Sequence, residues 1–314
     1  DEDEINARLN WVAFKQQFFS AIFIAKDGFD KPTTLTSTKS EGSKFIKDLA
    51  AKFELPYNHN RDEKLSFQFY FGPNHYKTLE SYNSGFEELI PLGWGIFGWV
   101  NEYIIINIFD FLSKYFSSYG IIILLLTMII KLGLSPFTYK AFLSQAKMKV
   151  LKPEIDNINE KNKGKDQMKI QQETMNLYRK AGVNPMGGCL PMLLQMPFFL
   201  AFYWVLLESV EIRQAPFFLW IQDLSSRDPY FILPLLMGAG MFFQQKLNPP
   251  PPDPMQAKVM SFLPIMFTGM FAFFPSGLVL YWLTNSLLSI AQQWRLNKKF
   301  GTKVPMDRVD GGGG

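Results

Sequence analysis

The sequence contains few of the side chains on which catalytic and metal sites depend. Among 314 residues there are one cysteine, Cys189, and two histidines, His59 and His75. One cysteine excludes a disulfide framework, and the three side chains together offer little material for a zinc cluster or a Cys–His nucleophile pair. The sequence also lacks an ATP-binding loop and a catalytic triad. We therefore predict that the protein is not an enzyme and that it has no catalytic residue, no metal and no cofactor.

Charge is also scarce, and it is unevenly distributed. Charged residues make up 19% of the chain, whereas aromatic residues reach 16%, which excludes a disordered protein. Residues 1–118 contain 12 Lys and Arg against 16 Asp and Glu, and residues 119–314 contain 20 against 12. The first part is therefore net negative and the second net positive. This asymmetry indicates two compartments rather than a nucleic-acid partner.

Residues 1–91 have the pattern of a soluble β-domain. The alternating apolar positions of one strand are Leu65, Phe67, Phe69 and Phe71, which predict that one face of this strand is buried. Gly72 and Pro73 are expected to end it.

Two other stretches complete the prediction for this domain. Residues 11–25 favour a strand pair, while residues 30–47 are polar and rich in turn residues. The domain is too small for a complete sandwich, and the chain has neither an initiator Met nor an N-terminal anchor helix. We therefore expect residues 1–91 to be the end of a larger β-sandwich in an N-terminally truncated chain.

Residues 92–118 predict an amphipathic helix. Its polar side chains Asn107, Asp110 and Lys114 form one narrow stripe, and Ile, Phe, Trp and Tyr occupy the other faces. Tryptophan and tyrosine suit the headgroup level of a bilayer, so we interpret this segment as an interfacial helix. The alternative is a buried core helix of the preceding domain.

Five apolar segments follow, with almost no charge inside them. They are residues 119–139, 189–207, 230–243, 259–274 and 277–290. The first two reach the ~20 residues that cross a ~30 Å hydrocarbon core, and the shorter ones are expected to thin the bilayer or to tilt their neighbours. We predict a polytopic α-helical membrane protein with a five-helix transmembrane core over residues 119–300. Residues 301–314 are then a tail that ends in a glycine linker.

The loops between these segments predict the orientation. Residues 140–186 contain ten Lys and Arg against five acids, whereas residues 208–229 contain two against four. By the positive-inside rule the first loop is cytoplasmic. Alternation then places the N-terminal domain in the periplasm and the C-terminus in the cytoplasm of a bacterial inner-membrane protein.

The cytoplasmic loop, residues 140–186, has the periodicity of a helical hairpin. Its candidate contact residues are Lys147, Lys149, Lys152, Lys161, Lys163 and Lys165. A basic surface beside a membrane can bind lipid headgroups or ribosomal RNA. A solvated connector without a partner is the alternative.

Lys131 is the ionisable side chain that lies well inside an apolar segment. Lysine near the centre of a helix in lipid costs ~2.5–3.5 kcal/mol on insertion scales. The five segments contain no acid that could neutralise it, so we expect a water-filled cavity rather than a buried ion pair. Snorkelling of the long side chain to the cytoplasmic interface is the alternative.

Other polar side chains of the segments are candidates for the same cavity. They are Thr127, Gln195, Thr284, Asn285 and Ser286. The alternative for each is an ordinary hydrogen bond between helices of a bundle. A hydrated, positively charged groove would lower the barrier for moving a short acidic stretch of another polypeptide partway across the membrane.

Several long motifs resemble one known family, in matching order and topology. They are TYKAFLSQAKMKVLKPEI (138–155), NPMGGCLPMLLQMP (184–197), VEIRQAPFFLWIQDLSSRDPYFILP (210–234), DPMQAKVM (253–260) and FPSGLVLYW (274–282). Over about residues 90–300 the chain resembles the YidC family of membrane protein insertases, which is related to the insertases of mitochondria and chloroplasts.

The resemblance implies a five-helix core whose groove opens to the cytoplasm and the lipid but is closed outside, with a periplasmic β-sandwich. The positive charge of the family groove is usually arginine, and the matching position here is Lys131, which lacks the bidentate guanidinium fork. Thr127, Gln195 and the pair Tyr281 and Trp282 match positions that line the family groove. The implied partners are nascent membrane proteins, the ribosome, the Sec translocon and membrane lipids, with no nucleic acid except ribosomal RNA.

Two other functions use the same features. A secondary transporter or channel would employ the polar cavity for small solutes, but it predicts inverted repeats and intramembrane acids, and we find neither in the sequence. A passive scaffold would hold finished membrane proteins, whereas an insertase meets nascent chains.

Overall fold

The computed structural model describes residues 2–39, 47–55, 64–162, 167–182, 190–247 and 254–300. The chain divides into two compact units, which are Asp1–Pro91 with Glu208–Val210, and Leu92–Leu207 with Glu211–Gly314. Lys163, Lys165 and the tail from residue 301 lie outside the described residues, as does the side chain of Lys149. We describe each unit separately.

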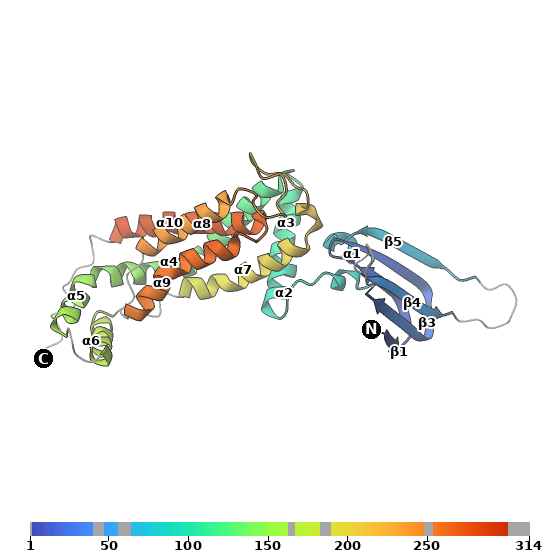
Figure 1. Cartoon of the computed structure of the whole chain (residues 1–314), viewed down its shortest axis with the longest axis horizontal. Helices are drawn as coiled ribbons and strands as arrows, with labels where there is room; N and C mark the ends of the chain where they lie inside the picture. The colour runs from blue at the N-terminus through green and yellow to red at the C-terminus, as the bar shows by residue number, and fades with distance from the viewer. Residues whose placement is uncertain are drawn as a thin grey trace. The chain divides into compact units, whose positions relative to one another are not determined.

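The first unit is an antiparallel sheet built on one long strand, β3 (Phe19–Thr38). Its other strands are β1 (Glu2–Ile5), β2 (Leu9–Lys15), β4 (Asp48–Glu54) and β5 (Phe67–Pro73). The first half of β3 pairs with β2 and β5, and its second half pairs with β1 and β4 (Figure 1). The predicted strand pair at residues 11–25 and the strand at residues 65–71 are thus confirmed.

The prediction of turns across residues 30–47 is wrong for its first part, because β3 continues to Thr38. Gly28 adopts a φ of +77°, and the register of β3 against β4 shifts between Asp30 and Thr34. A glycine with positive φ and a local bulge let a strand pass through residues that otherwise favour turns.

The phenylalanines of β5 share one face of the sheet, but they are not equally buried. Phe69 stacks on Phe23 with ring centroids 4.6 Å apart, yet Phe69 is 63% exposed and Phe71 is 75% exposed. The prediction of a buried face is therefore wrong for these two residues. The buried cluster centres on Val12 and Phe29, whereas Phe71 pairs near the start of β3. Two short helices, α1 (Tyr76–Glu80) and η1 (Phe86–Leu89), follow β5.

The second unit begins with a helix in three parts. They are α2 (Ile96–Val100), the π-helical η2 (Asn101–Ile105) and α3 (Ile106–Ser113). Ile105, Ile106 and Phe109 are buried, whereas the side chains of Trp94 and Tyr103 are more than half exposed. The helix predicted within residues 92–118 is therefore present from Ile96 to Ser113, with one apolar face packed and another open.

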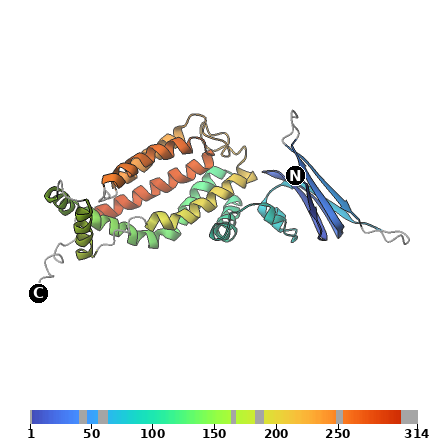
Figure 2. The ribbon, with the colours of Figure 1, turned by 60° about the horizontal axis from the view of Figure 1, so that its bottom comes forward.

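Five long helices form the body of this unit and run alongside one another (Figures 1 and 2). They are α4 (Tyr119–Val150), α7 (Leu190–Glu208), α8 (Ile232–Leu247), α9 (Pro254–Phe271) and α10 (Ser276–Phe300). The helix α10 packs against α4 and α8, and α8 packs against α9. Each of the five apolar segments is thus helical over most of its described length.

The five helices differ in the length of their apolar stretch. In the described part of the chain, only Tyr119–Tyr139 is both long and apolar enough to cross a membrane. Gln195–Glu208 and Lys258–Phe271 are shorter apolar helices. The helices α4 and α10 continue well beyond their apolar segments because polar residues extend them without a break.

A helical hairpin lies at the end of the bundle opposite α2 and α3 (Figures 1 and 2). It consists of α5 (Lys152–Lys161) and α6 (Gln167–Lys180). Met148, Leu151 and Tyr178 form a buried cluster that joins the end of α4 to α6. The hairpin thus has a small apolar core of its own.

Candidate functional site

Lys131 lies on α4 and is buried inside the bundle, with 5% of its surface exposed. Its Nζ donates to Ser289 Oγ at 2.7 Å, to Asn285 Oδ1 at 3.0 Å and to Gln195 Oε1 at 3.4 Å. Gln195 is on α7, and the other two partners are on α10. One ammonium therefore connects three helices that are far apart in the sequence. The side chain therefore stays inside the bundle.

The partners of Lys131 are neutral. An ammonium has three donors, and here each donor meets one oxygen of an amide or a hydroxyl group. Hydrogen bonds to a charged group contribute about 1.5–3 kcal/mol each, which is enough to offset the cost of holding the cation in the bundle. No carboxylate is among the partners that the described residues offer to Lys131. The charge is solvated but not cancelled.

Asn285 and Ser289 are one turn apart on α10, so their side chains lie on the same face. Ser289 Oγ also donates to the backbone oxygen of Asn285 at 2.8 Å, which orients the hydroxyl lone pairs toward Lys131. The sequence predicted Asn285 as a cavity residue but not Ser289. Because Ser289 follows Asn285 by four residues, helical spacing could have indicated that both face Lys131.

The buried polar surface of α10 continues beyond Ser289. Gln293, one further turn along, is 1% exposed. Gln292 Oε1 and Asn297 Nδ2 are buried atoms without a hydrogen-bond partner in the described part of the chain. This polar stripe runs toward the end of the bundle at which α5 and α6 lie (Figures 1 and 2). Buried polar atoms without protein partners are the usual positions of ordered water.

Two of the predicted groove residues bond to their own helices instead of to Lys131. Thr127 is 2% exposed, and its Oγ1 donates to the backbone oxygen of Ile123 at 2.6 Å. Thr284 Oγ1 donates in the same way to the oxygen of Leu280. A hydroxyl bonded to the preceding turn needs no partner on another helix.

Tyr281 and Trp282 belong to an aromatic cluster next to the lysine site. Tyr281 is 2% exposed and lies one turn before Asn285 on α10, with its ring 4.6 Å from that of Phe202. The Trp282 ring contacts Phe199 at 4.6 Å and Phe271 at 5.2 Å between centroids. An apolar aromatic layer therefore borders the Lys131 site on the side away from the hairpin.

A second buried ionic group lies in the loop between α7 and α8. Asp228 is 1% exposed; its Oδ1 accepts from Trp220 Nε1 and from the backbone N–H of Tyr230, both at 3.0 Å. Its Oδ2 accepts from the N–H of Leu233 in the first turn of α8 at 2.7 Å. Ser226 joins this loop to α10, since its carbonyl oxygen accepts from both N and Oγ of Ser276. The sequence did not predict the hydrogen bonds of Asp228.

Asp223 organises the rest of the same loop. Its carboxylate accepts hydrogen bonds from the Ser225 side chain and N–H, the Ser226 side chain and the N–H of Gln214. Burial alone would raise the pKa of Asp223, but these hydrogen bonds outweigh burial and hold the pKa below its usual value.

The predicted contact lysines of the hairpin are only partly described. Lys152 and Lys161 are exposed at the two ends of α5, and Lys147 is half-buried near the end of α4. Their exposure leaves the ammonium groups accessible.

Comparison with known proteins gives consistent matches along the whole chain. Residues 111–303 match the family model described as 60Kd inner membrane protein, and residues 1–106 match the model described as YidC periplasmic domain. The chain is 43% identical over 299 residues to a membrane protein insertase YidC of Hahella chejuensis, covering 94% of this chain and 50% of the relative. It is 42% identical over 303 residues to that of Azotobacter vinelandii, covering 95% and 53%.

The chain thus spans about half the length of the curated relatives it matches. It also resembles the solved structure of an active YidC insertase in which the first transmembrane domain is resolved. The TM-score is 0.54 and the identity 25%, over 92% of this chain and 64% of the solved one.

Proposed function

This chain belongs to the YidC family of membrane protein insertases, an inner-membrane family with a periplasmic β-domain and a helical core, and on that premise we propose that it inserts and folds nascent transmembrane segments in the bacterial inner membrane. It would act alone or beside the Sec translocon, through a hydrated groove open to cytoplasm and lipid. The observation that carries the proposal is the Lys131 ammonium, buried between three helices and held by neutral oxygens alone.

The polar stripe of α10 supports access to Lys131 from the cytoplasm. It leads from Asn285 and Ser289 past Gln293 to Asn297, which lies 12 residues from Asn285 and therefore ~18 Å along the helix. The unpartnered atoms of Gln292 and Asn297 favour water in this region. A short polar segment of a substrate would follow the same path.

The neutral partners make Lys131 a site that an acidic segment can occupy. A carboxylate is a stronger acceptor for an ammonium than an amide or a hydroxyl oxygen. An arriving Asp or Glu would therefore replace one or more of Gln195, Asn285 and Ser289 as acceptor. Because an acid at the bilayer centre costs ~2.5–3.5 kcal/mol, pairing with Lys131 would lower the barrier to its transfer.

Lysine in place of arginine changes how the acid is held. The guanidinium fork binds a carboxylate in two parallel bonds, whereas an ammonium binds as a point charge with three donors. We propose that Lys131 therefore attracts acids with less geometric selection and releases them more readily. This fits a transient role in transfer.

The hydrophobic part of the substrate would leave toward the lipid past Trp282 and the neighbouring aromatic rings of Phe199 and Phe271. Burial of ~20 apolar residues in the bilayer supplies the driving force, so no nucleotide is needed. The membrane potential can add to it.

The proposal includes a topology. The helices α4, α7, α8, α9 and α10 span the membrane, with residues 92–118 at the periplasmic interface and the hairpin in the cytoplasm, where its lysines meet the substrate or the ribosome. With 16 residues, α8 is ~24 Å long and shorter than a ~30 Å hydrocarbon core. A locally thinned bilayer beside the groove would accommodate it.

The test uses Lys131→Ala, Lys131→Glu and Lys131→Arg in proteoliposomes, with a single-span substrate whose short outer tail is acidic. We expect Lys131→Arg to retain insertion with slower release of the acidic tail, Lys131→Ala to insert the substrate more slowly than Lys131→Arg and Lys131→Glu to insert it least. Lys26→Ala, an exposed lysine of the β-unit, is the matched control. Equal insertion by wild type, Lys131→Ala and Lys131→Glu would contradict the role of the charge.

A photo-cross-linker in place of Trp282 tests the proposed activity itself. An insertase captures ribosome-bound nascent chains at this position, whereas a scaffold captures finished membrane proteins. Capture of finished proteins alone would overturn the proposal.

A further inference from the structure

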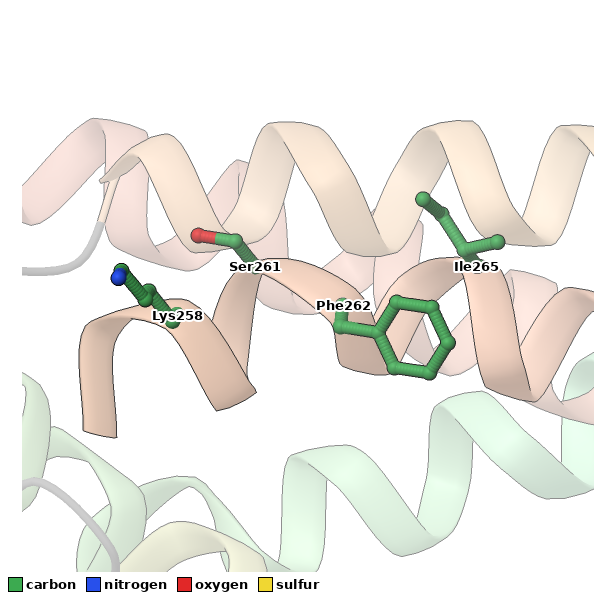
Figure 3. A pocket seen from close by; sticks show the side chains of 4 residues that line it. All are labelled: Lys258, Ser261, Phe262 and Ile265. Atoms are coloured by element: carbon green, nitrogen blue, oxygen red, sulfur yellow. The ribbon is translucent and has the colours of Figure 1, made fainter. Parts of the chain in front are cut away.

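A surface pocket of about 420 Å³ lies along one face of α9, away from Lys131 and its partners. It is lined by Lys258, Ser261, Phe262 and Ile265 (Figure 3). The spacing i, i+3, i+4 and i+7 places these residues on one side of the helix, over ~10 Å of its length. Phe262 is 60% exposed and Ile265 is 68% exposed, so the pocket faces the surroundings of the bundle.

The lining changes from charged to apolar along the helix. Lys258 and Ser261 supply an ammonium and a hydroxyl near the start of α9, and Phe262 and Ile265 supply apolar surface further along (Figure 3). In the sequences of α8 and α9 there is no Asp or Glu, and the charged residues are Lys246 and Lys258. Lys246 already lies over the Phe242 ring, with Nζ 4.6 Å from the centroid. Both charged residues of these two helices are therefore cations.

We propose that this pocket binds an anionic phospholipid. The lipid phosphate contacts Lys258 Nζ beside Ser261, and one acyl chain lies along Phe262 and Ile265. The groups of a phospholipid complement the pocket in order. Its anionic end matches the cationic end of the pocket, and its hydrocarbon chain matches the apolar part. The site depends on the membrane location of the helical unit and not on insertion activity, so either can fail without the other.

Two features favour a lipid over a protein segment. The pocket is open along its apolar part, as a chain within the hydrocarbon requires, and its polar groups are confined to one end. A lysine that extends from an apolar helix face toward the interface places its ammonium at the depth of lipid phosphates. An extended peptide would need polar partners for its backbone along the whole pocket, and Phe262 and Ile265 offer none.

The test is a titration of the purified full chain with dioleoyl-phosphatidylglycerol or dioleoyl-phosphatidylethanolamine, followed by native mass spectrometry. We expect tighter binding of the anionic lipid, and we expect Lys258→Gln to weaken it about fivefold, as one basic residue at a membrane surface does. Lys298→Gln removes the same charge from the cytoplasmic end of α10 and should change the affinity less than twofold. Lys258→Arg should bind as the wild type does.

Two further measurements distinguish the contribution of the acyl chain from that of the phosphate. Phe262→Ala should weaken binding of the dioleoyl lipid but not of glycerophosphoglycerol, because the latter has the same anionic group and no acyl chain. Millimolar inorganic phosphate should not compete. Equal losses for Lys258→Gln and Lys298→Gln, no preference for the anionic lipid, or full competition by inorganic phosphate would each overturn the proposal.

Discussion

Among the described residues of the helical unit two ionic side chains are buried, and they are held in opposite ways. Asp228 obtains its three donors from Trp220, Tyr230 and Leu233, all within eight residues of itself. Lys131 obtains its three acceptors from residues that are 64, 154 and 158 positions away. The first network is complete within one loop and the first turn of the helix that follows it, whereas the second exists only when α4, α7 and α10 are assembled.

The difference separates a structural role from a functional one. A shift of α4, α7 or α10 leaves the Asp228 network in place, because its donors lie in one short stretch of chain between Trp220 and Leu233. The Lys131 network loses an acceptor whenever α7 or α10 shifts, and a substrate carboxylate can take the vacant place. We therefore expect changes at Asp228 to affect stability first and changes at Lys131 to affect transfer first.

The largest effect is expected for Asp228→Ala. This change leaves the Trp220 indole and two backbone N–H groups without acceptors in a buried place, at a cost of about 3 kcal/mol in the free energy of unfolding. The thermal unfolding midpoint in detergent measures it. Asp228→Asn retains the shape and one acceptor and should cost less; equal midpoints for Asp228→Ala and the wild type would contradict the assigned role.

Lys131→Met should slow insertion strongly and change stability little, the reverse of Asp228→Ala. Methionine has a similar length and no charge, so it fills the same space between the helices. The loss of three hydrogen bonds is offset by the removal of a buried cation, and we expect a smaller drop in the unfolding midpoint than for Asp228→Ala. If the ammonium offsets about half of the ~3 kcal/mol cost of an acid in the bilayer, its removal slows insertion of an acidic-tailed substrate about tenfold. Insertion rate and unfolding midpoint are measured on the same preparation. A large loss of stability with normal insertion would contradict the functional role of Lys131.

Ser289→Ala should have an intermediate effect. It removes one of three acceptors of Lys131, which corresponds to about 1 kcal/mol, and leaves the ammonium readier to bind a substrate acid. We expect a small drop in the unfolding midpoint with normal or faster insertion. Ser286→Ala, a buried serine of α10 outside the described partners of Lys131, is the control and should leave insertion unchanged.

The smallest effect concerns pH and Asp223. The folded-state pKa of Asp223 lies below the ordinary value of 3.8, so the folded protein binds this proton less readily than the unfolded chain does. Its stabilising contribution is therefore complete above the unfolded pKa and is lost as the pH falls through the lowered folded pKa. Unfolding midpoints of the wild type and Asp223→Asn should converge on acidification. A difference independent of pH would show that the carboxylate charge is irrelevant.

The sequence predicted the Lys131 site in part. Lysine in an apolar segment and polar residues in other segments were sufficient to bring together Lys131, Gln195 and Asn285. Ser289 was missed because a serine in a transmembrane helix usually packs against a neighbour or bonds to its own helix, as Thr127 does. Whether Ser289 accepts from Lys131 or only packs against a neighbouring helix depends on which face of α10 is turned toward α4, and the sequence does not specify that rotation.

The β-unit shows where periodicity fails. The strand pair at residues 11–25 was predictable from alternation, but the continuation of β3 through Gly28 and Asp30 was not. Gly28 and its neighbours favour turns locally, and pairing with β4 over a shifted register outweighs that preference. Alternation also assigns Phe69 and Phe71 to one face without saying how much of that face is covered.

Exchange of charges tests the central claim most directly. Wild type and Lys131→Glu are compared in proteoliposomes with two substrates that differ only in an acidic or a basic outer tail. The amide and hydroxyl partners of residue 131 can donate as well as accept, so they can hold either charge. The account predicts that the wild type inserts the acidic tail faster and that Lys131→Glu inserts the basic tail faster. The same preference in both proteins would contradict it.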